Sequence, residues 1–124
     1  MKKIIPLLAL AFIAAIPAAS ALTQKQVREC QALAGSFGPG KTALEAKVLE
    51  RDTLAVEAEA AGEAWENAEN VRTLGADEAA EADRLRVIFE DNKAAFEIVE
   101  ADLHRASSKL NADFARFNSL CVTD

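Results

Sequence analysis

The stretch GSFGPGKT, residues 35–42, matches the phosphate-loop pattern G-x-x-x-x-G-K-[ST]. In nucleotide-binding proteins this loop presents backbone amides to the phosphates, and it connects a buried strand to a helix. Residues 22–34, LTQKQVRECQALA, have a helix cap and helical spacing instead of an apolar strand, and no later strand ends in an aspartate that could hold magnesium. A structural role therefore fits the stretch better, with nucleotide binding through Gly35–Thr42 as the alternative.

The same residues predict a break between two helices. Gly35 is a typical helix end, and Pro39 disfavours a continuing helix because it lacks an N–H group and its ring clashes with the preceding turn. Thr42 then begins a capping box, Thr42-Ala43-Leu44-Glu45, which opens the next helix. The sequence thus predicts a Gly/Pro hinge, with the Lys41 side chain in solvent and the Phe37 side chain in the apolar contact between helices.

An acidic segment lies further along the chain, where residues 63–83 carry seven acids against one base, Arg72. The acids are Glu63, Glu66, Glu69, Asp77, Glu78, Glu81 and Asp83. Such a cluster could hold a cation or dock a basic protein, but it lacks the spacing of a calcium loop. A solvated helix tip is the structural interpretation.

The other reactive residue types form no catalytic or metal-binding set. His104 is the only histidine; Glu100 precedes it by four residues on the same helical face, but a zinc site normally has four ligands. Ser107 and Ser108 stand near Lys109 without a base oriented by a third group. We therefore expect no enzyme activity, no cofactor, no metal site and no small-molecule substrate.

The N-terminal segment indicates export. Residues 1–21 combine two lysines, an apolar run from Ile4 to Ala18 and the cleavage pattern Ala19-Ser20-Ala21, which together predict a cleaved signal peptide and a periplasmic or secreted protein. The run is too short for a comfortable membrane span, so we expect no stable membrane insertion after cleavage. Without Lys2 and Lys3, 12 basic residues face 20 acidic ones, a net charge of −8 that disfavours nucleic acid and anionic lipids.

The two cysteines, Cys30 and Cys121, lie near opposite ends of the exported chain. An oxidising compartment favours a disulfide between them. A redox-active pair would more commonly be a close C-x-x-C motif.

Amino-acid composition and the residues typical of helix ends predict an all-α protein with one domain, residues 22–124. Ala, Glu, Leu and Lys/Arg dominate, and tyrosine is absent. A capping box at residues 23–26, the hinge glycines, Gly75 and a cap at Asp77 place helices near 23–34, 42–73 and 77–120.

The third helix carries a coiled-coil seam. Its mostly apolar members alternate by three and four residues: Ala82, Leu85, Phe89, Asn92, Phe96, Val99, Leu103, Ala106, Leu110, Asp113, Phe117 and Leu120. A period of 3.5 residues held this long is typical of a coiled coil. A turn at Gly75 predicts an antiparallel hairpin, in which facing residues have numbers that sum to about 150. The second helix matches this register, although Lys47 and Arg51 interrupt its stripe.

The first helix has two possible placements. Folded back along the second helix, it would put Cys30 level with residues near 104, roughly 25 Å from Cys121 at 1.5 Å per residue. If it instead continues the arm beyond the hinge, Cys30 faces Cys121 within reach of a disulfide, and Phe37 extends the seam. The second placement satisfies both the hydrophobic pattern and the cysteines.

Function is predicted only by class: a non-enzymatic envelope protein that acts as an interaction, adaptor or structural module. Apolar residues beside the seam exceed what one helix pair covers, which indicates self-association or a protein partner. They are Val48, Leu49, Val56 and Val71 on the second helix, and Val87, Ile88, Ile98 and Phe114 on the third. One alternative is an inhibitor or chaperone-like protein that binds a basic partner through the acidic tip. Another is a three-helix monomer whose first helix covers these flanks.

Overall fold

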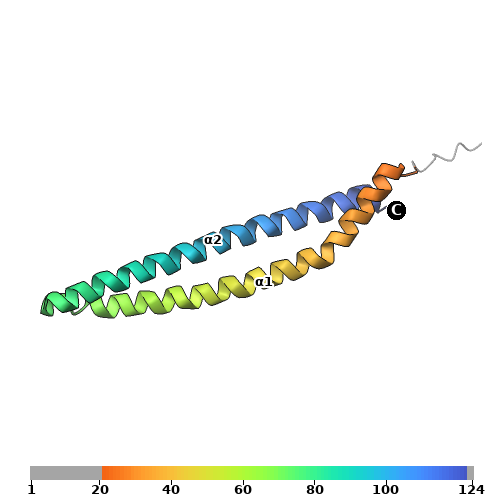
Figure 1. Cartoon of the computed structure of the whole chain (residues 1–124). Coiled ribbons are helices and arrows are strands. Elements are labelled where there is room, and N and C mark those ends of the chain that lie inside the picture. The colour runs from red at the N-terminus through yellow and green to blue at the C-terminus, as the bar shows by residue number, and fades with distance from the viewer. Residues whose placement is uncertain (1–20, 123–124) are drawn as a thin grey trace, which may run out of the picture.

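The chain forms one long antiparallel helical hairpin (Figure 1). The computed structural model describes residues 21–122. Helix α1 spans Gln24–Glu69, a short 3-10 helix η1 spans Arg72–Leu74, and α2 spans Ala76–Cys121. The predicted all-α, coiled-coil-like hairpin is confirmed, with the turn at the expected place.

Local sequence signals define most helix ends. Thr23 begins α1 with the predicted capping box: its Oγ1 accepts from the Gln26 amide at 3.2 Å, and its own amide donates to Gln26 Oε1 at 2.8 Å. The helix ends at Glu69 instead of near Thr73, because the residues predicted as its last turn form the 3-10 helix η1. Gly75, with extended backbone, is the N-cap of α2, so the predicted cap at Asp77 is wrong and Asp77 lies in the first turn of the helix.

The two helices pack through the predicted seam. All twelve seam residues of α2 are buried or half-buried, although within residues 21–122 only Ala82 and Val99 are buried, and Val99 is still 9% exposed. A single layer of two helices has no third element to cover its outer surface, which explains the thin core.

The register along the hairpin is constant. Gly62 lies against Phe89, where an added Cβ would come 3.2 Å from the ring, and Gly40 lies in the same way against Leu110, at 3.3 Å. Near the open end, Phe37 stacks on Phe114. The numbers in each pair sum to 150 or 151, as the turn at Gly75 predicts. At the two glycine levels a small residue faces a large one, so the helices can approach closely there.

The predicted helix break at residues 35–41 is wrong. Helix α1 continues through this segment with Pro39 inside it, so the first two predicted helices are one. The segment does bend, and the N-terminal arm of α1 swings across the end of α2 in Figure 1. Pro39 removes one helical hydrogen bond and its ring crowds the turn before it, which produces a bend when other contacts keep the helix intact.

The N-terminal arm continues α1 and does not fold back along it. Cys30 and Cys121 consequently face each other with Cα atoms 5.7 Å apart and sulfurs at disulfide distance. This arrangement confirms the second of the two predicted placements, and the structure contains no three-helix bundle among the described residues. The predicted signal peptide, apart from Ala21, lies outside the described residues.

Candidate interaction surfaces

The segment that matches a phosphate loop is helical in the structure. An α-helix commits its backbone amides to carbonyls of the preceding turn, whereas a phosphate loop leaves them free to converge on the ligand. Thr42 donates its hydroxyl to the Gly38 carbonyl at 3.1 Å, and Lys41 lies 3.7 Å from Glu45. The lysine and threonine of the pattern are therefore engaged within α1.

Arg72 organises the acidic end of the hairpin. Its guanidinium donates to Glu69 at 2.8 Å and to Asp83 at 2.7 Å, so η1 connects the end of α1 to the start of α2. These hydrogen bonds lower the pKa of both carboxyl groups and raise the pKa of Arg72. Arg84 similarly holds Glu81, 2.6 Å away, and lowers its pKa. Three of the seven predicted acids are thus engaged in ion pairs.

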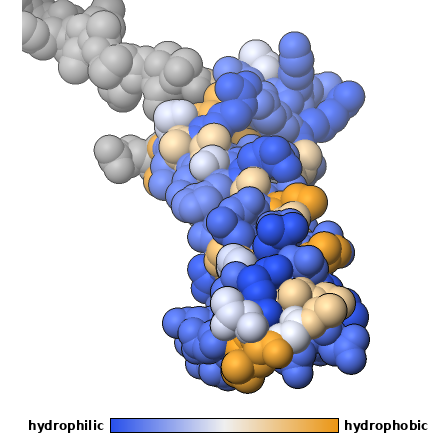
Figure 2. All heavy atoms as spheres, turned by 90° about the vertical axis from the view of Figure 1, so that its left-hand side faces the viewer, coloured by the Kyte–Doolittle hydropathy of each residue, from blue (hydrophilic) through white to orange (hydrophobic). Residues whose placement is uncertain are grey.

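The other acids of this end divide into two groups. Asp77 and Glu78 occupy the first turn of α2, where the positive end of the helix dipole favours carboxylates, and Glu78 lies over Gly75. Glu63 and Glu66 are exposed and have no ion pair among the described residues. Seen from this end, the surface is mostly hydrophilic with small hydrophobic areas (Figure 2).

No metal centre is evident at these acids. Within residues 21–122, no group of three or more His, Cys, Asp or Glu residues could hold a metal ion.

A shallow hollow opens beside the seam near the turn. It measures about 390 Å³ and is lined by Gly62, Trp65, Glu66, Glu69, Asn70 and Phe89. Trp65 stacks on Phe89 with ring centroids 5.5 Å apart, and its Nε1 is buried without a hydrogen-bond partner. Gly62 forms part of the lining, where its lack of a side chain lets the Phe89 ring lie close to α1.

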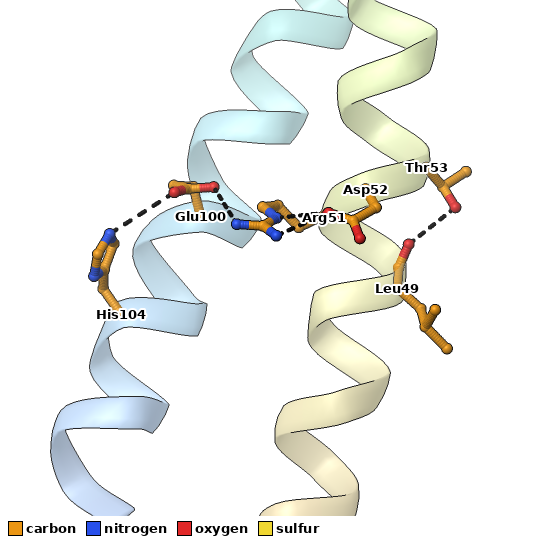
Figure 3. Close-up of polar contacts among 6 residues, drawn as sticks. All are labelled: Leu49, Arg51, Asp52, Thr53, Glu100 and His104. Carbon is orange, nitrogen blue, oxygen red and sulfur yellow. Dashed lines mark hydrogen bonds and ion pairs between the residues drawn. The ribbon is translucent and has the colours of Figure 1, made fainter. Parts of the chain in front are cut away.

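A polar layer interrupts the seam halfway along the hairpin (Figure 3). Arg51 reaches from α1 toward α2, 3.8 Å from Glu100, while it also pairs with its neighbour Asp52 at 2.8 Å. Glu100 Oε1 lies 3.8 Å from His104 Nε2, and Glu100 Oε2 is buried without a hydrogen bond. The sequence predicted weaker apolar pairing at Arg51, and the structure adds the ion pair that replaces it.

Seven of the eight apolar residues predicted beside the seam are exposed, and two of these, Leu49 and Val56, lie on the outer face of α1 and not beside the seam. Leu49 is 70% exposed and Val56 66%, and the remaining exposed members of the predicted set are Val71, Val87, Ile88, Ile98 and Phe114. Val48 is half-buried, and Phe114 is partly covered by its stacking on Phe37. The structure thus places the predicted interaction residues Val56 and Ile88 at the surface, on different helices.

Comparisons with protein-family models, curated proteins and solved structures found no match to this chain. In the described part of the chain, neither helix contains an apolar stretch long enough to cross a lipid bilayer.

Proposed function

We propose that this protein is an exported, non-enzymatic helical module of the cell envelope that works by associating with a protein. The observation that carries the proposal is the excess of exposed apolar side chains on a hairpin with almost no core. Leu49, Val56 and Ile98 are each more than 60% exposed, in a molecule where two residues of the described range are buried. Apolar rows of this kind are typical of interfaces.

Export is part of the proposal. The signal-peptide pattern of residues 1–21 and the facing cysteines both suit an oxidising compartment such as the periplasm or the extracellular space.

Association can be tested on the oxidised protein that begins at Leu22. Light scattering coupled to size-exclusion chromatography gives its mass, and affinity capture from envelope extracts of the source organism identifies bound proteins. A variant that combines Val56→Glu with Ile88→Glu should lose self-association or capture, while Asn111→Glu, the control at another exposed position, should not. A monomer that captures nothing would remove the proposal.

The acidic tip supports a second candidate, an inhibitor or chaperone-like role toward a basic protein. Glu63, Glu66, Asp77 and Glu78 are the acids of the tip that have no ion pair among the described residues. Replacing Glu63 and Glu66 with Gln should weaken capture of a basic partner in this case and leave a partner on the apolar rows bound.

A further inference from the structure

The outer face of α1 carries a second heptad row, opposite the seam. Its residues are again spaced by four and three: Thr42, Ala46, Leu49, Thr53, Val56 and Ala60. All six are exposed and uncharged, and in Figure 3 Leu49 and Thr53 point away from α2. We call these six residues the outer row. A period of 3.5 residues on a helix is the pattern that accepts a partner helix.

Both threonines contribute apolar surface to this row. The hydroxyl of Thr53 donates to the Leu49 carbonyl at 3.0 Å, and that of Thr42 donates to the Gly38 carbonyl at 3.1 Å. Because these hydroxyls are satisfied by the helix itself, a partner helix would not have to supply hydrogen bonds to them.

Acidic side chains border the outer row on both edges. Glu45, Asp52 and Glu59 follow one edge at heptad spacing, and Glu50 and Glu57 follow the other. Asp52 pairs with Arg51 and Glu45 with Lys41, but no ion pair in residues 21–122 involves Glu50, Glu57 or Glu59. Between Arg51 and Arg72 the sequence has no lysine or arginine, so the part of this face that follows Arg51 is negative.

We propose that the outer row docks an amphipathic helix of another protein, with an apolar stripe against Leu49 and Val56 and with lysine or arginine along both edges. The inference rests on the proposed function and names its surface and partner class. Thr42 to Ala60 spans about 27 Å at 1.5 Å per residue, enough for a partner helix of five turns. Edge charges opposite the acids would select the partner and its orientation.

The charges argue against a second copy of this chain as the occupant. Two outer rows packed face to face would bring acidic edges against acidic edges, which costs free energy. The corresponding row of α2 is interrupted by Asp91 and Arg105, so it offers no continuous apolar stripe. A basic helix is the occupant that satisfies both the apolar row and its edges.

A pair of designed peptides tests the surface directly. Both are 21-residue helices with the same leucine and alanine stripe. One peptide carries lysine at the edge positions, and the other carries glutamate there. Calorimetry should show binding of the lysine peptide to the oxidised protein that begins at Leu22, a decrease of affinity with added salt, and no binding of the glutamate peptide. Leu49→Glu with Val56→Glu should weaken binding at least about tenfold, because the apolar stripe is lost.

Asn111→Glu is the control, since Asn111 is exposed on α2 and lies outside the row and outside the predicted interaction set. Circular dichroism verifies that each variant keeps its helices. The proposal is overturned if the lysine peptide does not bind, if both peptides bind equally, or if the variant on the outer row binds as tightly as Asn111→Glu.

Photo-crosslinking separates this inference from the proposed function. A crosslinking residue replaces Thr53 on the outer row or Ala101 on α2, and the protein is exposed to envelope extract. A crosslink at position 53 to a segment of basic, amphipathic sequence supports the proposal. Crosslinks at position 101 alone would overturn the outer-row proposal and leave the proposed association intact. A crosslink from position 53 to a second copy of this chain would have the same consequence. No crosslink at either position would count against the outer-row proposal and against association.

Discussion

Phe37 of α1 stacks on Phe114 of α2 with ring centroids 4.1 Å apart, and Phe117 meets Phe37 edge-on. Phe37 lies inside the Gly/Pro-rich segment whose local propensity is to break a helix. The arm that carries it is also held by the facing cysteines and by the ion pair between Glu29 and Arg116, which lowers the pKa of Glu29. Contacts with α2 therefore keep α1 helical across residues that would not form a stable helix alone.

The first prediction concerns the cysteine link. Cys30 and Cys121 are 91 positions apart, and closing a loop of this size stabilises the folded state by about 4–5 kcal/mol in the chain-entropy model. Reduction, or Cys121→Ser, should therefore lower the thermal midpoint and reduce helical ellipticity at 222 nm as the N-terminal arm frays. Ser119→Ala is a control on the same exposed turn. Two reactive thiols in the native exported protein would contradict the pairing.

Periodicity and one turn were enough to predict the hairpin and its register. The unbroken 3.5-residue spacing of α2 indicated a coiled coil, and Gly75 set which residues face each other. The helix break was mispredicted because Gly35 and Pro39 are local signals, whereas the contacts that override them come from α2, far away in sequence.

The surfaces were predictable only in part. Exposure of Val56 and Ile88 followed from the helical pattern. The engagement of Glu69 and Asp83 by Arg72 did not, because it depends on the path of η1 between the two helices. The outer row was also missed, since its threonines look polar until their hydroxyls are seen to bond to the helix backbone.

The second prediction uses two glycines of α1 as a matched pair. An added Cβ at Gly35 meets nothing within 4 Å, whereas at Gly62 it comes 3.2 Å from the Phe89 ring. Gly35→Ala should stabilise the protein by about 0.5–1 kcal/mol through helix propensity. Gly62→Ala should gain the same helix propensity, but the added methyl group crowds the Phe89 ring at a cost of about 1–3 kcal/mol, so the protein should not be stabilised. Thermal unfolding compares them, and an equal rise of both midpoints would mean that the helices are not in close contact at Phe89.

The third prediction is a stability change with pH at the Arg72 cluster. Hydrogen bonds from Arg72 lower the pKa of Glu69 from 4.5 and that of Asp83 from 3.8. A carboxyl whose pKa is lower when folded stabilises the fold at pH values above its unfolded pKa, and this contribution is lost as the pH falls through the folded pKa.

The midpoint should therefore decrease as the pH falls below about 4.5, and Arg72→Gln should make that decrease smaller. The effect will be modest because both carboxyl groups are exposed to solvent and Arg72 is only half-buried. Thermal melts between pH 3 and pH 7 measure it. An identical pH profile in Arg72→Gln and in Lys93→Gln, a control on an exposed lysine, would contradict the role of the cluster.

The fourth prediction addresses the nucleotide alternative. Because residues 35–42 are helical and Lys41 pairs with Glu45, Mg-ATP and Mg-GTP should leave the thermal midpoint unchanged, and Lys41→Ala should behave like the wild type. Calorimetric titration gives an independent measurement. A nucleotide-dependent rise that disappears in Lys41→Ala would establish phosphate binding and would require the segment to leave the helix.

The last prediction compares Lys47 and Arg51, the two basic residues in the α1 seam. Both are half-buried, but only Arg51 has an ion pair across the hairpin in the described residues, with Glu100. Lys47→Met should stabilise the protein by about 1 kcal/mol, since an apolar chain replaces a charge in the seam. Arg51→Met should gain less or destabilise, because Glu100 Oε2 is buried and would lose the guanidinium that lies 3.8 Å away.

Replacing both partners, Arg51→Met with Glu100→Met, should recover the loss, because no unpaired carboxylate is then left in the seam. Chemical denaturation of the four variants provides the comparison, with Glu100→Met completing the double-mutant cycle. If Arg51→Met stabilised as much as Lys47→Met, the ion pair would contribute nothing. A deficit in Arg51→Met that is absent from the double variant would instead show that Arg51 offsets the cost of placing the Glu100 carboxylate in the seam.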